Sequence, residues 1–411
     1  TTAMYLLHTA DWHLGKALFG RSLLEDQAYF LLEWLLPLLD RERPDAVLLA
    51  GDVFDRQVPP TEAVLLFDEF LRGLQARNLP LLAVTGNHDG EKRLSLGTSF
   101  LRREGVVLAT RPQDLDTPYV LETKAGESAR FYFLPYCTPA AAREALGDDS
   151  IHTQNDAYRA LLGRLELPDD LPNVLITHCF AAGSTAGASE NPAFVGPASQ
   201  VGLDCFSPFS YVALGHLHRP QKAGPGRYAG APLAYSFDEE GQEKSVTRVF
   251  LEHGAVHCEE LPFVPPRRVR RVRGLFAALL AQAQAAPSED YLFVSLTDPA
   301  PVYQPLDRLR PYWPNVLTVA NECFLHMGTG ETAQLREEIR QHRAGDEAVF
   351  RAFLKEICGE EATDADLKHF AKTQKEVSAL CPRYFYRCRR SAPTSTPRAS
   401  ILRGSGSTRC F

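Results

Sequence analysis

The chain has 411 residues, of which 45% are hydrophobic and 23% charged, as in a globular protein of about two or three domains. No apolar run approaches the ~20 residues that a membrane-spanning helix needs, and the N-terminus lacks a signal-peptide pattern, so we expect a cytoplasmic protein without a membrane partner. The net charge of −7 excludes a chain coated in positive charge, although residues 377–411 hold seven arginines and no acidic residue, which leaves −14 on the remainder.

From the N-terminus to about residue 260, short apolar runs alternate with helical patterns. This alternation predicts an α/β layered fold with a largely parallel central sheet. The expected strands are 5–10, 46–50, 81–85, 130–135, 174–177 and 211–214, and the expected helices between the early strands are 23–39, 61–77 and 92–103. The later part of this region has fewer helices and ends in a strand at 245–252, which suggests a second sheet packed against the first.

A proline-rich break at 262–266 precedes a smaller region. We expect it to be a small α+β unit, with strands 267–273, 291–297 and 316–320 and helices 275–284 and 306–312. Residues 331–380 have helical patterns at 331–342, 347–356 and 364–373. The end of the chain is rich in Ser, Pro, Gly and Arg and is expected to be disordered, whether as a biological extension or as a cloning or reading-frame artefact. The predicted domains are therefore 1–262, 267–325, 331–380 and 387–411.

Four short motifs and one isolated histidine follow the predicted strands. They are Asp11-Trp12-His13, Gly51-Asp52, Gly86-Asn87-His88-Asp89, Gly215-His216-Leu217-His218, and His178. In an open α/β sheet, ligands and catalytic groups gather just beyond the carboxyl ends of the strands. Five strands therefore bring Asp, His and Asn side chains toward one edge. Asp-x-His or Gly-Asp alone is common, and a lone histidine is usually structural. Gly-Asn-His-Asp is more specific, because packing gives little reason for Asn-His-Asp at a strand end, and all five in this order are hard to reach by chance.

These residue types suit a pair of divalent metal ions. Two ions about 3.5–4 Å apart need a bridging carboxylate, and Asp52 is the natural bridge because it stands alone at the end of a central strand. The other ligands are expected to divide into Asp11, His13 and His218 for one ion and Asn87, His178 and His216 for the other. A set without thiolate favours Mn²⁺, Fe²⁺ or Zn²⁺, of which we expect Mn²⁺.

The order and content of these motifs resemble the calcineurin-like metallophosphoesterase superfamily, and the surrounding residues resemble its SbcD family of bacterial DNA repair nucleases. The matching stretches are 8–15, 50–55, 213–219, 228–232 and 236–239. The resemblance covers residues 4–262 and, in outline, the small α+β unit, and it fades beyond about residue 380. It implies a two-sheet α/β/β/α sandwich with a small α+β capping domain and C-terminal helices.

The resemblance also implies an activity. Members of the family are metal-dependent nucleases that act at DNA ends, as exonucleases on duplex and endonucleases on single strands or hairpins. They work in repair and recombination as homodimers with an SbcC-type ATPase. Carried over residue by residue, the metal ligands are Asp11, His13, Asp52, Asn87, His178, His216 and His218, and His88 is a catalytic histidine that does not bind metal. Asp55 departs from the archaeal and eukaryotic relatives, which carry histidine at that position.

His88 and Asp89 fit catalysis on chemical grounds as well. Phosphodiester hydrolysis needs an activated water and a protonated leaving group, and a histidine beside the metals is suited to donate that proton. Asp89 has two interpretations. It orients the His88 imidazole, as carboxylates do for other catalytic histidines, or it caps a turn with its side chain.

Three further segments each have two interpretations. The apolar segment 23–39 fits core packing alone or core packing together with a dimer interface. The helices within 345–380 fit ordinary packing, or the docking of an ATPase that the family implies there. The arginine-rich run 267–273 fits a solvated strand or a track for DNA phosphates, for which the candidate residues are Arg267, Arg268, Arg270 and Arg271.

Two other classes of function compete with a DNA nuclease. The same dimetal scaffold also suits a small-molecule phosphodiesterase or a phosphoprotein phosphatase, and the residues around Trp12 together with the appended α+β unit favour the nuclease. A non-catalytic binding module is expected to have lost some of its ligands, whereas here all seven are present together with His88.

Overall fold

The structure is a computed structural model that describes residues 3–187, 189–190, 199–252, 255–322, 346–358 and 362–380. The chain divides into two compact units. One contains Thr1–Thr297 and Tyr303–Ala320, and the other contains Asp298–Val302 and Asn321–Phe411. None of the helices in the described ranges has both the length and the apolar character required to cross a membrane.

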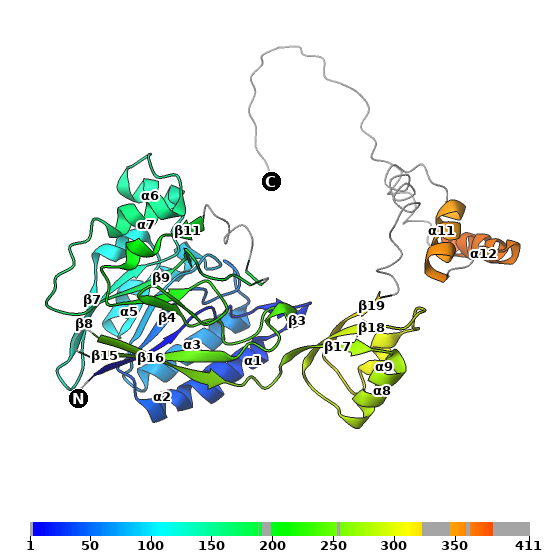
Figure 1. The fold of residues 1–411 in the computed structure, drawn as a ribbon, viewed down its shortest axis with the longest axis horizontal. Coiled ribbons are helices and arrows are strands. Elements are labelled where there is room, and N and C mark those ends of the chain that lie inside the picture. Colours follow the sequence, from blue (N-terminus) through cyan, green and yellow to red (C-terminus); the bar gives the residue numbers. More distant parts are fainter. Residues whose placement is uncertain are drawn as a thin grey trace, which may run out of the picture. The chain divides into compact units, whose positions relative to one another are not determined.

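The first sheet has six strands in the order β16-β15-β1-β4-β5-β6 (Figure 1). Its strands are β1 (Met4–Thr9), β4 (Ala46–Ala50), β5 (Leu81–Val84), β6 (Val106–Ala109), β15 (Lys244–Glu252) and β16 (Ala255–Phe263). The first four are parallel, and β15 and β16 form an antiparallel edge. The parallel strands are apolar and buried, as expected of a sheet covered on both faces.

The second sheet also has six strands, in the order β13-β14-β12-β9-β8-β7. They are β7 (Tyr119–Glu122), β8 (Ser128–Leu134), β9 (Asn173–His178), β12 (Tyr211–Gly215), β13 (Gln221–Ala223) and β14 (Gly226–Tyr228). A second sheet was predicted, but the 245–252 strand does not belong to it. That strand, β15, pairs antiparallel with β1 of the first sheet and covers a backbone edge that would otherwise be unpaired.

Helices cover the outer face of each sheet, so that the predicted α/β/β/α sandwich is confirmed (Figure 1). The helices packed on the first sheet are α1 (Leu24–Ala28), the π-helical η1 (Tyr29–Leu35), α2 (Leu36–Glu42) and α3 (Thr61–Gln75), and those on the second are α6 (Pro139–Leu146) and α7 (Gln154–Leu162). Alternate side chains of one strand enter different cores. In β4, Val47 packs beneath the helices and Leu48 faces the second sheet.

Two predicted helices are interrupted. Residues 23–39 form α1, η1 and the start of α2, where Pro37 has no backbone N–H to donate and a π-helical turn precedes it. Residues 92–103 form α4 (Glu91–Leu94) and α5 (Thr98–Arg103), which Gly97 separates with a left-handed φ of 77°. The apolar side chains of the first segment are mainly core, because Phe30, Leu31 and Leu35 are fully buried.

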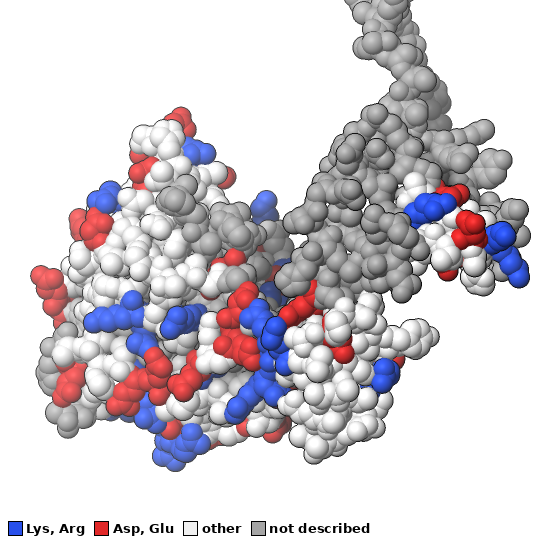
Figure 2. All heavy atoms as spheres, turned by 45° about the vertical axis from the view of Figure 1, so that its right-hand side comes forward, with Lys and Arg blue, Asp and Glu red and all other residues white. Residues whose placement is uncertain are grey.

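The small α+β unit was predicted with nearly these bounds. Its parallel strands β17 (Val269–Gly274) and β18 (Tyr291–Leu296) pair beside β19 (Val316–Asn321), with helices α8 (Phe276–Ala285) and α9 (Pro305–Leu309). Val269 and Tyr291 belong to the same buried core as the helices of the first sheet. Acidic and basic side chains lie side by side where this unit meets the sandwich (Figure 2).

The C-terminal unit contains α11 (Asp346–Cys358) and α12 (Asp364–Leu380), which confirm the helices predicted at 347–356 and 364–373. Phe350 stacks on Phe370 with a distance of 4.2 Å between ring centroids. The helix predicted at 331–342 and the tail at 387–411 lie outside the described residues. The domain limits 1–262, 267–325, 331–380 and 387–411 stay predictions.

Candidate metal centre

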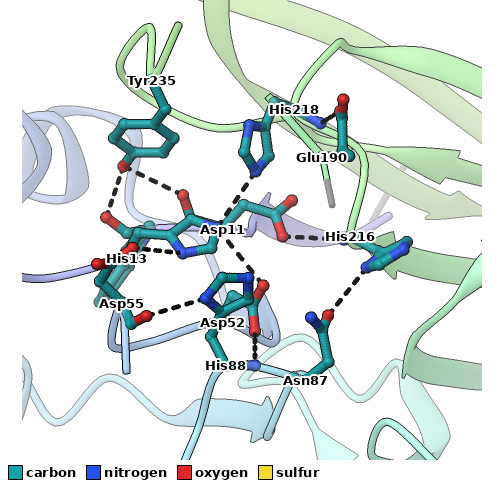
Figure 3. A network of polar contacts seen from close by, with 12 residues as sticks. Asp11, His13, Asp52, Asp55, Asn87, His88, Glu190, His216, His218 and Tyr235 are labelled. Carbon is teal, nitrogen blue, oxygen red and sulfur yellow. Dashed lines mark hydrogen bonds and ion pairs between the residues drawn. The ribbon is translucent and has the colours of Figure 1, made fainter. Parts of the chain in front are cut away.

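The seven predicted ligands come together in one cluster, to which both sheets contribute (Figure 3). Asp11, Asp52 and Asn87 lie just after β1, β4 and β5 of the first sheet. His178 ends β9, and His216 follows β12 of the second sheet. The expectation that strand ends from distant parts of the sequence meet at one place therefore agrees with the structure.

The backbone at these strand ends is unusual. Four non-glycine residues of the cluster have positive φ angles: Asp11 (54°), His13 (44°), Asp52 (50°) and His216 (110°). Such conformations cost about 1–3 kcal/mol each and are found where the surrounding structure fixes a functional side chain. Their concentration here indicates that the loops are shaped to aim side chains rather than to optimise local stability.

Two glycines of the motifs stand where there is no room for a side chain. A Cβ atom on Gly86 would lie 2.1 Å from Oδ1 of Asp52, and one on Gly215 would lie 1.7 Å from the carbonyl oxygen of Ala50. Both distances are far below van der Waals contact. The second of them lies where the two sheets approach each other, so glycine at this position lets the two groups of ligands meet.

Asp52 stands between two groups of ligand atoms. Its Oδ2 lies 3.4 Å from Nε2 of His13 and 3.4 Å from Nε2 of His178. On one side, Nε2 of His13 faces Nε2 of His218 at 3.2 Å. On the other side, Oδ1 of Asn87 lies 3.0 Å from Nε2 of His178 and 3.0 Å from Nδ1 of His216. His13 and His218 thus lie on one side of this carboxylate, and Asn87, His178 and His216 lie on the other. The division of the ligands between two ions stays a prediction, and Asp11, whose Oδ1 lies 3.9 Å from Nδ1 of His178, is not assigned to either side by these contacts.

The buried charges shift one another's pKa values. Burial, with a contribution from Asp52, raises the pKa of Asp11 to about 7. Burial opposes ionisation of Asp52 as well, but His178 and His13 outweigh it and hold its pKa well below the usual value. Burial lowers the pKa of His13 to about 4, whereas at His178 the Asp52 carboxylate outweighs burial and raises the pKa to about 9. A cation bound among these groups would stabilise the ionised carboxylate of Asp11 and so offset the effect of burial on its pKa.

The residues present fit a pair of divalent metal ions. Among the described residues, Oδ2 of Asp11 is buried and has no hydrogen-bond partner. Nε2 of His178 and Nδ1 of His216 face each other at 3.3 Å, so that the two imidazoles present nitrogen atoms to the same point. Carboxylate, imidazole and amide oxygen donors together suit Mn²⁺, Fe²⁺ or Zn²⁺.

In His178 and His218, the imidazole nitrogen that faces away from the cluster has a partner. Nδ1 of His178 donates to the carbonyl oxygen of Ala50 at 2.9 Å. Nδ1 of His218 lies 3.3 Å from Oε1 of Glu239 and 2.9 Å from Oγ of Ser189. Such contacts fix the ring orientation and leave Nε2 for a metal. The sequence did not predict a role for Glu239 or Ser189. Glu239 ends the stretch 236–239, which matches the family, but that stretch carries no chemical signature of its own, and Ser189 belongs to no motif.

Gln27 and Tyr235 hold the loop that carries His13. Oε1 of Gln27 accepts from the N–H of Gly15 at 2.9 Å, and its amide donates to the carbonyls of Trp12 at 3.1 Å and His13 at 2.8 Å. The hydroxyl of Tyr235 donates to the same Trp12 carbonyl at 2.6 Å. Sequence reasoning missed both residues, since a single glutamine in a helix and a single tyrosine in a loop give no local signal.

His88 lies beside the cluster with one ring nitrogen already engaged. Its Nδ1 donates to the backbone carbonyl of Asp55 at 2.9 Å, and its backbone N–H donates to Oδ1 of Asp52 at 2.9 Å. Nε2 is therefore the nitrogen left for proton transfer. The side chain of Asp55 lies 2.8 Å from Nζ of Lys16 and 3.6 Å from Nδ1 of His13. Asp55 thus supports both histidines.

The contacts of Asp89 do not support its predicted orienting role. Its buried carboxylate accepts backbone N–H groups of Gly86 at 2.9 Å, Val53 at 3.1 Å and Phe54 at 2.9 Å. These bonds use both carboxylate oxygens, and the ring of His88 bonds elsewhere. The capping interpretation is the one that the structure supports, because Asp89 ties together the two loops that carry the ligands after β4 and β5.

The four arginines predicted to contact DNA lie in or just before β17. The structure pairs three of them with carboxylates, Arg267 with Glu25 and Asp26, Arg270 with Asp290, and Arg271 with Asp238. Arg268 is exposed and has no carboxylate partner among the described residues. The DNA contact therefore stays a prediction, and three of its residues have other partners within the chain.

Comparison with known proteins identifies the class. Residues 4–220 match the family model of calcineurin-like phosphoesterases, so the chain belongs to this family of phosphoester hydrolases that use divalent metals. Residues 265–357 match a second family model, SbcD_C, described as the type 5 capsule protein repressor C-terminal domain. Among solved structures, TT1561 of Thermus thermophilus is 14% identical, with 63% of this chain and 99% of that chain covered and a TM-score of 0.36. The two family matches together support an SbcD-like protein.

Proposed function

We propose that the chain is a metal-dependent DNA nuclease of the SbcD type. In this proposal it hydrolyses phosphodiester bonds at DNA ends in repair and recombination, as an exonuclease on duplex and an endonuclease on single strands and hairpins. The observation that carries the proposal is the cluster of seven ligand side chains about Asp52, with His88 beside it. The match of residues 265–357 to SbcD_C supports the choice of a nuclease over other phosphoesterases.

The side chains divide the chemistry among them. A pair of divalent ions, expected to be Mn²⁺, supplies an activated water and neutralises the phosphate oxygens when bound. Asp52 would be shared by the two ions. Asp11, His13 and His218 would hold one ion with it, and Asn87, His178 and His216 would hold the other. His88, whose Nδ1 is held by the Asp55 carbonyl, presents Nε2 to protonate the leaving oxygen.

We also propose three partners, which are DNA, an SbcC-type ATPase and a second copy of the chain. The ATPase is assigned to α11 and α12, of which α11 lies almost entirely within the SbcD_C match and α12 lies beyond it. A dimer interface at 23–39 has little support, because the apolar side chains of that segment are mainly core. Leu65 on α3 and Phe100 on α5 are 61% and 72% exposed, which makes these helices the better candidates for a self-contact.

The decisive experiment is digestion of end-labelled duplex and hairpin DNA in Mn²⁺, with and without the ATPase. We expect cleavage that EDTA abolishes. A parallel panel of nucleotide monoesters and a phosphoprotein tests the competing activities. Hydrolysis of these substrates without cleavage of DNA would replace the nuclease by a small-molecule phosphodiesterase or a phosphatase. A chain that binds no metal and hydrolyses none of them would be a binding module.

A further inference from the structure

A short turn after Ser236 serves the α+β unit and the proposed metal centre at once. The 3₁₀ turn η5 (Phe237–Glu239) ends in Glu239, which is buried and braces Nδ1 of His218. The carboxylates before and after Glu239 both bind Arg271 of β17. Asp238 accepts from the guanidinium of Arg271 at 2.6 Å, and Glu240 accepts from the backbone N–H of Arg271 at 2.9 Å.

Helix α1 has the same arrangement. Gln27 bonds the loop that carries His13, as described above. The residue before it, Asp26, is 1% exposed and points to the α+β unit. Oδ2 of Asp26 accepts from the hydroxyl of Tyr291 at 2.5 Å, and Oδ1 lies 3.3 Å from Nε of Arg267. Neighbouring residues of one helix thus contact the α+β unit and the ligand loop.

The junction between these two braces is only partly filled by apolar packing. Phe237 packs edge-on against Phe293 of β18, with 5.4 Å between ring centroids. The same junction also holds a cavity of about 560 Å³, whose lining includes Asp26, Glu239 and Arg267. The acidic and basic side chains at the junction (Figure 2) therefore add to the apolar contact that Val269 and Tyr291 make with the core of the sandwich.

We propose that Glu239 and Gln27 are positioning residues of the metal centre, and that docking of the α+β unit through Arg267 and Arg271 sets their geometry. This inference rests on the proposed metal centre but not on DNA as the substrate. Partners that orient a ligating histidine typically change metal affinity by about 10–100-fold when removed. A partner or substrate that moves the α+β unit then changes the metal affinity of the centre. In this role Arg267 and Arg271 are clamps, which here means ion pairs that hold the α+β unit against the sandwich.

Three arginine variants of the full chain test the proposal. Arg267→Ala and Arg271→Ala each remove a clamp, and Arg268→Ala is the matched control, since it removes the same charge from an exposed residue of the same run. Mn²⁺ affinity is measured by calorimetry on metal-stripped protein, together with hydrolysis of bis(p-nitrophenyl) phosphate, which is too small to need a DNA track. Arg267→Ala should weaken Mn²⁺ binding by at most about tenfold, the lower end of the range for direct partners, because Arg267 acts through Asp26 and Gln27 and not on a ligand.

The loss of Mn²⁺ affinity should be larger for the more deeply buried arginine. The side chain of Arg267 is 13% exposed and that of Arg271 is 46% exposed, so Arg271→Ala should weaken binding less than Arg267→Ala does. Arg271→Lys keeps the charge opposite Asp238 and should restore most of the affinity. Glu239→Gln keeps a hydrogen-bond acceptor for His218 and should bind Mn²⁺ more tightly than Glu239→Ala. Melting of the metal-free variants separates loss of folding from loss of the brace.

Each failure has its own signature. Mn²⁺ affinity equal to wild type in Arg267→Ala and Arg271→Ala, with folding intact, overturns the coupling. Unchanged Mn²⁺ affinity with an equal loss of DNA affinity in all three variants, including Arg268→Ala, assigns the run to phosphate contact instead. A wild-type chain that binds Mn²⁺ but does not cleave DNA refutes only the nuclease proposal. A wild-type chain that binds no Mn²⁺ refutes the metal centre.

Discussion

The ring of His88 is held through one nitrogen, as the ring of His178 is. Nδ1 donates to a backbone carbonyl, and no side chain proposed as a ligand is needed to hold the ring. Asp52, by contrast, contacts histidines of both ligand groups. Replacing His88 and replacing Asp52 should therefore have different effects on metal binding and on hydrolysis.

His88→Ala should retain bound metal and lose hydrolysis by about 10²–10⁴-fold, the range of a general acid or base. Asp52→Ala should lose both, because the shared carboxylate is removed. Metal content by mass spectrometry and cleavage of labelled DNA, measured on both variants, check this. An active His88→Ala protein would remove the proton-transfer role, and a metal-free one would make His88 a ligand.

His8 gives a pH-dependent stability that is separate from the metal centre. It is buried, with Nδ1 2.9 Å from the hydroxyl of Tyr211, and burial lowers its pKa to about 3. The unfolded chain binds a proton at His8 below about pH 6.5 and the folded chain does not, so stability is lost as the pH falls through this range. From pH 7.5 to pH 5 the loss should be about 2 kcal/mol.

The measurement compares urea unfolding of wild type and His8→Gln at pH 7.5 and pH 5, with EDTA present. The variant keeps a polar side chain that does not titrate, so it should lose less stability than wild type over this interval. Identical losses in the two proteins would mean that His8 is not the group that titrates.

At the scale of elements, the close approach of β12 to β4 is what makes the site. The two strands belong to different sheets, and the missing Cβ of Gly215 lets them meet beside Ala50. Asp89 makes a second connection, between the loops after β4 and β5. The ligands are therefore positioned by contacts between elements, and only in part by the strands that carry them.

Gly215→Ala should lower the free energy of unfolding by about 3 kcal/mol, because the new methyl group must displace backbone. Gly274→Ala is the control, since the nearest atom to its Cβ would be a flexible Leu279 side chain at 3.4 Å. Urea unfolding of both variants checks the difference. Equal stabilities would show that the sheets can separate at this point without cost.

On the scale of the whole molecule, the four layers create three cores, and the metal centre lies where both sheets contribute residues. A buried cluster of carboxylates and imidazoles is poorly stable without a cation, as the raised pKa of Asp11 indicates. Bound metal should therefore raise the stability of the sandwich in addition to supplying chemistry for hydrolysis.

Adding Mn²⁺ to metal-stripped protein should raise the free energy of unfolding by about 2.7 kcal/mol at a free concentration 100 times the Kd of a site. The gain should disappear in Asp52→Ala, which serves as the control. Thermal melts at increasing Mn²⁺ concentration check this. A melting temperature that does not respond in wild type would exclude tight binding at the cluster.

Much of the fold was predictable from local signals. The strands 46–50 and 211–214 are apolar runs that end in Gly or before Gly, and the structure has them within one residue. Strand β6 (Val106–Ala109) was missed, although a short apolar run follows Gly105, because four residues are too few to distinguish a strand from a helical turn. The place of β15 could not be predicted, since pairing with β1 joins residues more than 230 positions apart.

By itself the sequence determined the strands and the side chains that end them, because an apolar run followed by Asp, His or Asn is a local pattern. The sequence also places glycine at positions 86 and 215, where a Cβ atom would lie within about 2 Å of other atoms. Only the tertiary structure decided the partners. His88 bonds the carbonyl of Asp55 rather than the adjacent Asp89, and Gln27 and Glu239 brace ligands far away in the sequence. Such contacts depend on how sheets, helices and the α+β unit pack together, and no local pattern of residues encodes that packing.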